Sequence, residues 1–257
     1  MRSRSPSGSP VSRLILVGAV HGDPLGYART QLCLHALQPD LLFVELSPYG
    51  KAFRSDNQAA LQRTLHSNLS VAAGKHAMPL RRALGHPEIK AIRRQLALPF
   101  EYRAAFRYSR ASGAGLFLVD DSSFSRRMIA SWPEMLSAEN LSLLLSLSRE
   151  SRFAMTSLYD LAARRIRSEG PAVFDLAKAG TAEADPLWKL RERRMADAVR
   201  SVLWSRHCRK AVYLGGWRHL ATGGNLPSLR ELLGIGPSQC HLLDRGLLCS
   251  SATTEPL

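Results

Sequence analysis

The sequence is short of the features that would place it in a membrane or outside the cell. It has four cysteines, Cys33, Cys208, Cys240 and Cys249, which show neither a C-x-x-C spacing nor a disulfide framework. Its most apolar late run, residues 141–147, is interrupted by serines and falls far short of the roughly 20 residues that a membrane helix needs. The first ten residues are rich in turn formers, and no apolar core of a secretory signal follows them. We therefore expect a soluble, cytoplasmic protein without a transmembrane segment, whose thiols are buried and reduced.

Lysine is also scarce, because only six of the 35 basic residues are lysines and arginine supplies most of the net charge of +14. A surface this basic attracts phosphate, acidic lipid or acidic substrates, without identifying which. Between residues 81 and 108, arginines are interleaved with aromatic residues, a pattern that can bind nucleic acid. We favour an amphipathic helix with its aromatic side chains inward and its arginines in water, and we do not expect nucleic acid as a partner.

Several short apolar runs, separated by helical stretches, indicate an α/β fold. The 257 residues are enough for one large α/β domain or two small ones. The runs are rich in branched side chains, as buried parallel strands are, and they cover residues 14–17, 41–44, 116–119 and 211–214, with a candidate fifth strand at 238–243. Residues 24–37 have the length and composition of a crossover helix. We predict a single domain at 13–245, between a disordered start (1–12) and a tail (246–257), with a central, mostly parallel sheet surrounded by helices and with large helical insertions.

Two histidines follow predicted strands with the same spacing. Gly18-x-x-His21 and Gly216-x-x-His219 lie near opposite ends of the chain, and the strand at 41–44 ends in Glu45. Parallel strands end at the same edge of a sheet, where open α/β proteins bind their ligands. We therefore expect His21 and Glu45 beside each other, at the ends of neighbouring strands, with His219 in the same crevice. Each glycine would permit a tight exit from its strand.

This set of residue types suits hydrolysis in two ways. Two imidazoles and a carboxylate are the ligands of a catalytic metal that keeps a position open for water, so His21, Glu45 and His219 could hold manganese, cobalt, zinc or iron. Without metal, a histidine or Glu45 would be the general base, and Arg191 or a backbone amide would stabilise the oxyanion. Arg191 could instead form a purely structural salt bridge with Glu45.

Two acidic residues after the third predicted strand are further candidates for the site. Asp120 and Asp121 again place polar groups at a strand end. Capping the helix that follows explains them equally well.

Four segments resemble the successive motifs of the TraB/PrgY and TIKI superfamily, which also takes in erythromycin esterase and ChaN. They are GAVH (18–21), PDLLFVELSP (39–48), RERRMA (191–196) and GGWRHL (215–220), and VDDSSFSR (119–126) is similar to a weaker family segment. The resemblance implies an erythromycin esterase/ChaN-like sheet and a site shared by His21, Glu45, Arg191 and His219. Glu192, a further candidate for the site, stands where the family prefers Asp or Asn, and the membrane helices that end many TraB-type members are missing.

The resemblance also implies a range of activities. TIKI proteins are metal-dependent proteases, erythromycin esterases open a lactone with activated water, ChaN binds haem, and PrgY-type members restrain a peptide signal. We expect a hydrolase of a peptide, amide or ester bond, with a peptide or a small molecule as substrate and a divalent metal as cofactor. The alternative is a binding protein that sequesters a peptide, haem or another acidic ligand and catalyses nothing.

Overall fold

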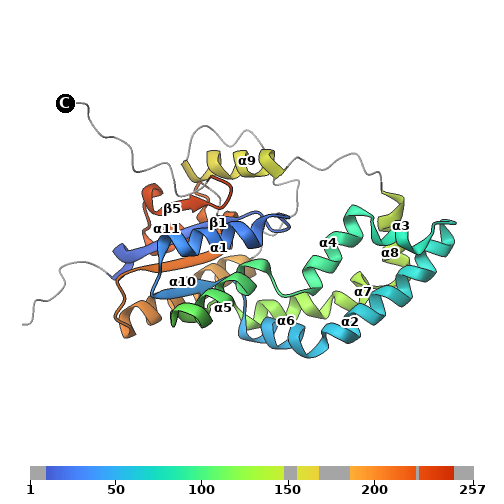
Figure 1. Cartoon of the computed structure of the whole chain (residues 1–257), viewed down its shortest axis with the longest axis horizontal. Coiled ribbons are helices and arrows are strands. Elements are labelled where there is room, and N and C mark those ends of the chain that lie inside the picture. The colour runs from blue at the N-terminus through green and yellow to red at the C-terminus, as the bar shows by residue number, and fades with distance from the viewer. Residues whose placement is uncertain (1–9, 148–154, 168–185, 224–225, 246–257) are drawn as a thin grey trace, which may run out of the picture.

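The computed structural model describes residues 10–147, 155–167, 186–223 and 226–245 (Figure 1). Most of the predicted disordered start and the whole predicted tail lie outside these ranges. Residues 10–12 do not fit the predicted disorder, because they belong to a 3-10 helix in which Val11 packs on the core.

The elements in chain order are η1 (Pro10–Arg13), β1 (Leu14–Ala19), α1 (Gly26–Leu37), β2 (Leu41–Val44), α2 (Pro48–Lys75), α3 (Leu80–Leu84), α4 (Pro87–Leu96), α5 (Phe100–Ser112), β3 (Gly115–Leu118), α6 (Ser122–Ala130), α7 (Trp132–Met135), α8 (Ala138–Ser146), α9 (Met155–Arg167), α10 (Pro186–Ser205), β4 (Ala211–Gly216), η4 (Trp217–Leu220), α11 (Leu229–Leu233), η5 (Pro237–Gln239) and β5 (Cys240–Leu242).

The five strands form one sheet in the order β3-β2-β4-β1-β5, and every pair is parallel. The predicted α/β class and parallel sheet are therefore confirmed. One expectation is wrong, because β1 and β2 are not neighbours and β4 lies between them. Every residue of β2 and β4 is buried, so these strands are apolar on both faces. Such strands carry no pattern that tells which of them pair.

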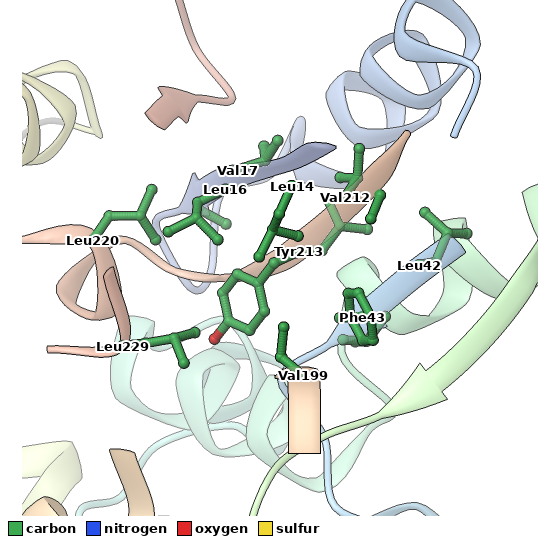
Figure 2. Close-up of a cluster of buried hydrophobic side chains, with 14 of the residues drawn as sticks. Leu14, Leu16, Val17, Leu42, Phe43, Val199, Val212, Tyr213, Leu220 and Leu229 are labelled. Atoms are coloured by element: carbon green, nitrogen blue, oxygen red, sulfur yellow. The ribbon is translucent and has the colours of Figure 1, made fainter. Parts of the chain in front are cut away.

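The sheet supplies the centre of the larger hydrophobic cluster (Figure 2). Phe43 of β2 and Tyr213 of β4 are fully buried there, and the same cluster includes Val199 of α10 and Leu229 of α11. On other sides of the cluster, α1 packs along α5 and α9 packs on β5. The large apolar residues of the strands thus fix the helices whose ends surround the carboxyl edge of the sheet.

A second hydrophobic cluster belongs to an arm of helices, which we define as α2, α3, α4, α6, α7 and α8. In Figure 1 these helices extend away from the sheet. Their cluster includes Leu69 of α2, Ile89 of α4, Trp132 of α7 and Leu141 of α8, all buried. Because α2 follows β2 and α6 follows β3 after only a few residues, the arm joins the sheet at the carboxyl edge.

The described helices contain none that is both long and apolar enough to cross a bilayer. Cys33, Cys208 and Cys240 are free thiols, and Cys249 lies outside the described residues. Burial raises the pKa of Cys33 to about 12, which keeps this thiol protonated and unreactive at neutral pH.

Candidate functional site

The predicted site residues meet at the carboxyl edge of the sheet. Asp120 follows β3, Glu45 follows β2, His219 lies in η4 directly after β4, and His21 follows β1. These are four adjacent strands, so their ends form a continuous row. Arg191 reaches the row from the first turns of α10. The structure thus brings together all four principal candidates and Asp120.

Two glycines at the end of β4 make room for this cluster. A Cβ atom on Gly216 would lie 2.7 Å from His21 Nε2, and one on Gly215 would lie 2.8 Å from Glu45 Oε2. Such distances are shorter than real Cβ contacts, so a side chain at Gly216 would push His21 away, and one at Gly215 would displace Glu45 and also the Tyr213 hydroxyl, which is nearer still. His21 and Glu45 therefore approach each other although β4 separates their strands.

The Glu45 side chain is 8% exposed, and both of its carboxylate oxygens have protein partners. Oε1 accepts a hydrogen bond from Arg191 Nη2 at 2.6 Å and lies 2.9 Å from His219 Nε2, and Oε2 accepts from the Gly216 amide at 2.6 Å. Burial would raise the pKa of Glu45, but the charges of His219 and Arg191 outweigh it and hold that pKa well below its ordinary value. Glu45 is therefore a fixed negative charge.

His219 is held between two carboxylates. Its Nδ1 lies 2.5 Å from Glu192 Oε1 and its Nε2 2.9 Å from Glu45 Oε1, while the ring stacks on Trp188 at 5.3 Å between centroids. Burial opposes protonation, but the charges of Glu45 and Glu192 raise the pKa of His219 from 6.5 to about 10. At neutral pH this raised pKa favours the imidazolium form, whose two nitrogens both face carboxylates.

Arg191 joins Glu45 to Asp120. Its Nε donates to Asp120 Oδ1 at 2.7 Å, and its Nη2 donates to Asp120 Oδ2 at 3.0 Å and to Glu45. The guanidinium also lies 4.6 Å from the ring centroid of Phe124 and 4.9 Å from that of Trp188. The structural salt bridge between Arg191 and Glu45 is thus present. Among the described residues, no side chain or carbonyl accepts a hydrogen bond from Nη1 of this guanidinium.

His21 differs from the other members because 61% of its side chain is exposed to solvent. Its Nδ1 lies 3.1 Å from Glu101 Oε1, and its Nε2 lies 3.8 Å from Glu45 Oε2. Desolvation of the ring lowers its pKa, but the hydrogen bond to Glu101 and the charges of Glu45 and Glu101 raise it to about 9. Solvent at the exposed ring screens part of this effect. The His21 ring is therefore the exposed imidazole of the cluster, whereas that of His219 is buried.

The remaining two candidates, Glu192 and Asp121, lie in different places. Glu192 is fully buried in the cluster, where its Oε2 also accepts from the Leu229 amide at 2.6 Å. Asp121 is the N-cap of α6, accepts from the Ser123 and Phe124 amides, and pairs with Arg194 at 2.5 Å. Its helix-capping role is therefore confirmed, and its contacts lead away from Glu45.

The donor set does not fit a divalent ion in this arrangement. Both Glu45 oxygens accept hydrogen bonds, both His219 nitrogens face carboxylates, and Arg191 lies against the oxygen that an ion would take. Within the part of the chain that the structure describes, no group of three His, Cys, Asp or Glu side chains could hold a metal ion. Metal binding by His21, Glu45 and His219 stays a prediction, which chelation tests.

Sequence reasoning missed two residues of the site. Glu101 contacts His21 from α5, and Trp188 covers His219 and Arg191 from α10. Glu101 stands in the first turn of its helix, where acidic residues are common because they interact favourably with the helix dipole. Trp188 falls on the apolar side of a helical stripe. In the sequence, neither Glu101 nor Trp188 can be distinguished from a residue with a purely structural role.

Comparison of the chain with protein-family models, with curated proteins and with solved structures finds no match. The fold and the site define an α/β protein with a parallel five-stranded sheet and a charged cluster at its carboxyl edge. The resemblance to the TraB/PrgY and TIKI superfamily stays a prediction.

Proposed function

We propose that the protein is a hydrolase of ester, amide or peptide bonds, in which His21 and Glu45 activate a water molecule. One observation carries the proposal: Nε2 of His21, whose side chain is 61% exposed, lies 3.8 Å from Oε2 of Glu45, whose side chain is 8% exposed. A water molecule at ordinary hydrogen-bond distances of about 2.8 Å from both atoms is compatible with that separation. It would be next to a base and open to a substrate from the solvent side.

In the proposed reaction, neutral His21 takes a proton from this water through Nε2 while the water oxygen attacks the carbonyl carbon. The carbonyl π electrons move to its oxygen, and the tetrahedral intermediate then expels the alcohol or amine, which receives the proton from His21. Glu45 stabilises the positive charge that develops on His21. Because the neutral ring is the reactive form, the rate should rise with pH until His21 has lost its proton, at a pH as high as about 9.

Arg191 and His219 support this step by holding Glu45. Their two positive charges offset the cost of burying its carboxylate, and the Gly216 amide fixes the second oxygen. Stabilisation of the oxyanion by Arg191 is part of the proposal, and it would use Nη1. No step of this mechanism passes through a metal.

The test is hydrolysis of p-nitrophenyl acetate and of a quenched fluorescent peptide library by the wild type and by His21→Ala. Loss of a general base should lower the rate about 100-fold or more, with an unchanged circular dichroism spectrum. The matched control is His66→Ala, at an exposed position of α2, which should retain the wild-type rate. Equal rates for His21→Ala and the wild type would reject the assignment.

A chelator separates this proposal from the metal-dependent version. After dialysis against EDTA the rate should be unchanged. Loss of activity that manganese, cobalt, zinc or iron restores would instead favour a metal at His21, Glu45 and His219. A protein that hydrolyses nothing but retains a peptide or haem through purification would favour the binding function.

A further inference from the structure

Glu101 is a buried carboxylate that points at the candidate site. Its residue is 3% exposed, and within the described part of the chain its carboxylate hydrogen-bonds to one side chain, that of His21. Burying a carboxylate is costly unless a partner offsets the lost hydration. The partner here is a ring with most of its surface in solvent, so simple burial of apolar area does not explain the contact.

The helix that carries Glu101 is firmly attached to the sheet. Tyr102, Ala104 and Ala105 are buried, and Gln31 of α1 donates to the Ala104 carbonyl at 2.9 Å. The ring of Phe100 occupies the space where a Cβ atom of Gly26 would be, so α1 and α5 approach closely at the first turn. The position of Glu101 is therefore set by rigid elements rather than by a loop.

We propose that Glu101 is a positioning residue, which accepts the Nδ1–H of His21 and so keeps the Nε2 lone pair directed at the water beside Glu45. This inference rests on the proposed function. In a neutral imidazole one nitrogen carries the proton and the other accepts a hydrogen bond. An acceptor placed beside one nitrogen keeps the proton on that nitrogen and so fixes the tautomer. Without Glu101 the ring is free to rotate and to carry its proton on Nε2, the tautomer that ordinary histidine side chains prefer. That tautomer cannot act as a base on the water.

The two histidines of the site then have separate tasks. His219 faces a carboxylate at each nitrogen and stacks on Trp188, so its ring is fixed against Glu45. His21 meets a close carboxylate at Nδ1 alone, and its Nε2 stays 3.8 Å from the nearest acidic oxygen. Glu101 is what gives His21 the arrangement of a base with an orienting partner.

Nitrogen-15 NMR of the histidine rings tests the proposal without a substrate. At pH 10, where His21 is mostly neutral, the wild type should show the Nδ1–H tautomer, and Glu101→Leu should shift His21 toward the Nε2–H tautomer. Since leucine could disturb the first turn of α5, Glu101→Gln is a second variant of the same shape. The matched control is Glu134→Gln. Glu134 is an exposed acidic residue in the first turn of α7, so its substitution should leave the tautomer of His21 unchanged.

Hydrolysis of p-nitrophenyl acetate by the same proteins gives the second readout. Both Glu101 variants should lower kcat at least about tenfold and change KM less than twofold. A wild-type tautomer of His21 in both variants, or wild-type kcat in both, overturns the proposal. If the wild type hydrolyses nothing while the tautomer shifts as expected, the hydrolase function fails and the positioning role of Glu101 stands.

Discussion

At the residue scale, the predicted site residues do lie together, but the role predicted for Gly216 differs from the one that the structure shows. Gly216 was expected to allow a tight turn, but its φ of −62° is open to any residue. It has to be glycine because His21 occupies the space of a Cβ atom. His21, Glu45 and His219 were predictable because parallel strands end together. Glu101 was not, since its role depends on a contact between residues 80 positions apart.

Gly216→Ala tests this steric account. The added methyl group would lie 2.7 Å from His21 Nε2, and the exposed ring can move to avoid it. We expect hydrolysis to fall about 100-fold, because small misplacements of a catalytic group have effects of this size. The free energy of unfolding should fall by only about 1 kcal/mol. Rates and urea unfolding curves measure the two effects.

Gly74→Ala is the control for that substitution. Gly74 lies in α2 with no atom within 4 Å of the added methyl group, so alanine should stabilise the helix by about 0.5–1 kcal/mol. Its hydrolysis rate should equal that of the wild type. If Gly216→Ala is as active as Gly74→Ala, the close approach of His21 to β4 has no functional role.

At the scale of elements, the positions of the strands and helices along the chain were more predictable than the order in which the strands pair. Four apolar runs and the crossover helix are found where they were expected, and the fifth candidate forms β5. The pairing of β1 with β4 was not visible, because strands buried on both faces pair equally well in several orders. In α5, Tyr102 and Tyr108 point inward as predicted, but Phe106 is 48% exposed.

The start of α6 allows a prediction with a defined pH dependence. Burial opposes ionisation of Asp121, but Arg194 and the Phe124 and Ser123 amides outweigh it, and the pKa of this carboxyl lies below its ordinary 3.8. Its stabilising effect is therefore fully present above pH 3.8 and is lost as the pH falls through the lower value of the folded state. Asp121→Ala should reduce the free energy of unfolding by about 1 kcal/mol at pH 7.

Denaturant unfolding at pH 7 and at pH 3 measures this effect. The difference in the free energy of unfolding between the wild type and Asp121→Ala should be smaller at pH 3 than at pH 7. Asp197→Ala is the comparison, because its exposed pair with Arg200 contributes little at either pH. A difference for Asp121→Ala that stays constant between the two pH values would contradict the role of its charge.

At the scale of the whole molecule, the predicted insertions form a unit with a core of its own. The single domain predicted at 13–245 contains two hydrophobic clusters, one around the sheet and one inside the arm. Composition indicated helices in the segment after β2 and in the segment after β3. It could not show that α2 and α8, which are far apart in the sequence, pack together. The site lies at the edge where the arm leaves the sheet, because Glu45 and Asp120 stand a few residues before α2 and α6.

Trp132→Ala tests whether the arm opens independently of the sheet. Trp132 is buried in the arm cluster, where Phe53 packs edge-on against its ring and Arg54 lies 5.0 Å from its centroid. Removing such a side chain costs about 3–5 kcal/mol. We expect faster amide hydrogen exchange in α2, α4 and α8, with unchanged protection of β1 and β4, because those strands belong to the other cluster.

Val212→Ala is the counterpart in the sheet cluster. Val212 is fully buried in β4, so its truncation should speed exchange in the strands themselves. Mass spectrometry of exchanged peptides compares the two variants. If Trp132→Ala increases exchange in β1 and β4 as much as in the arm, the two clusters unfold as one cooperative unit.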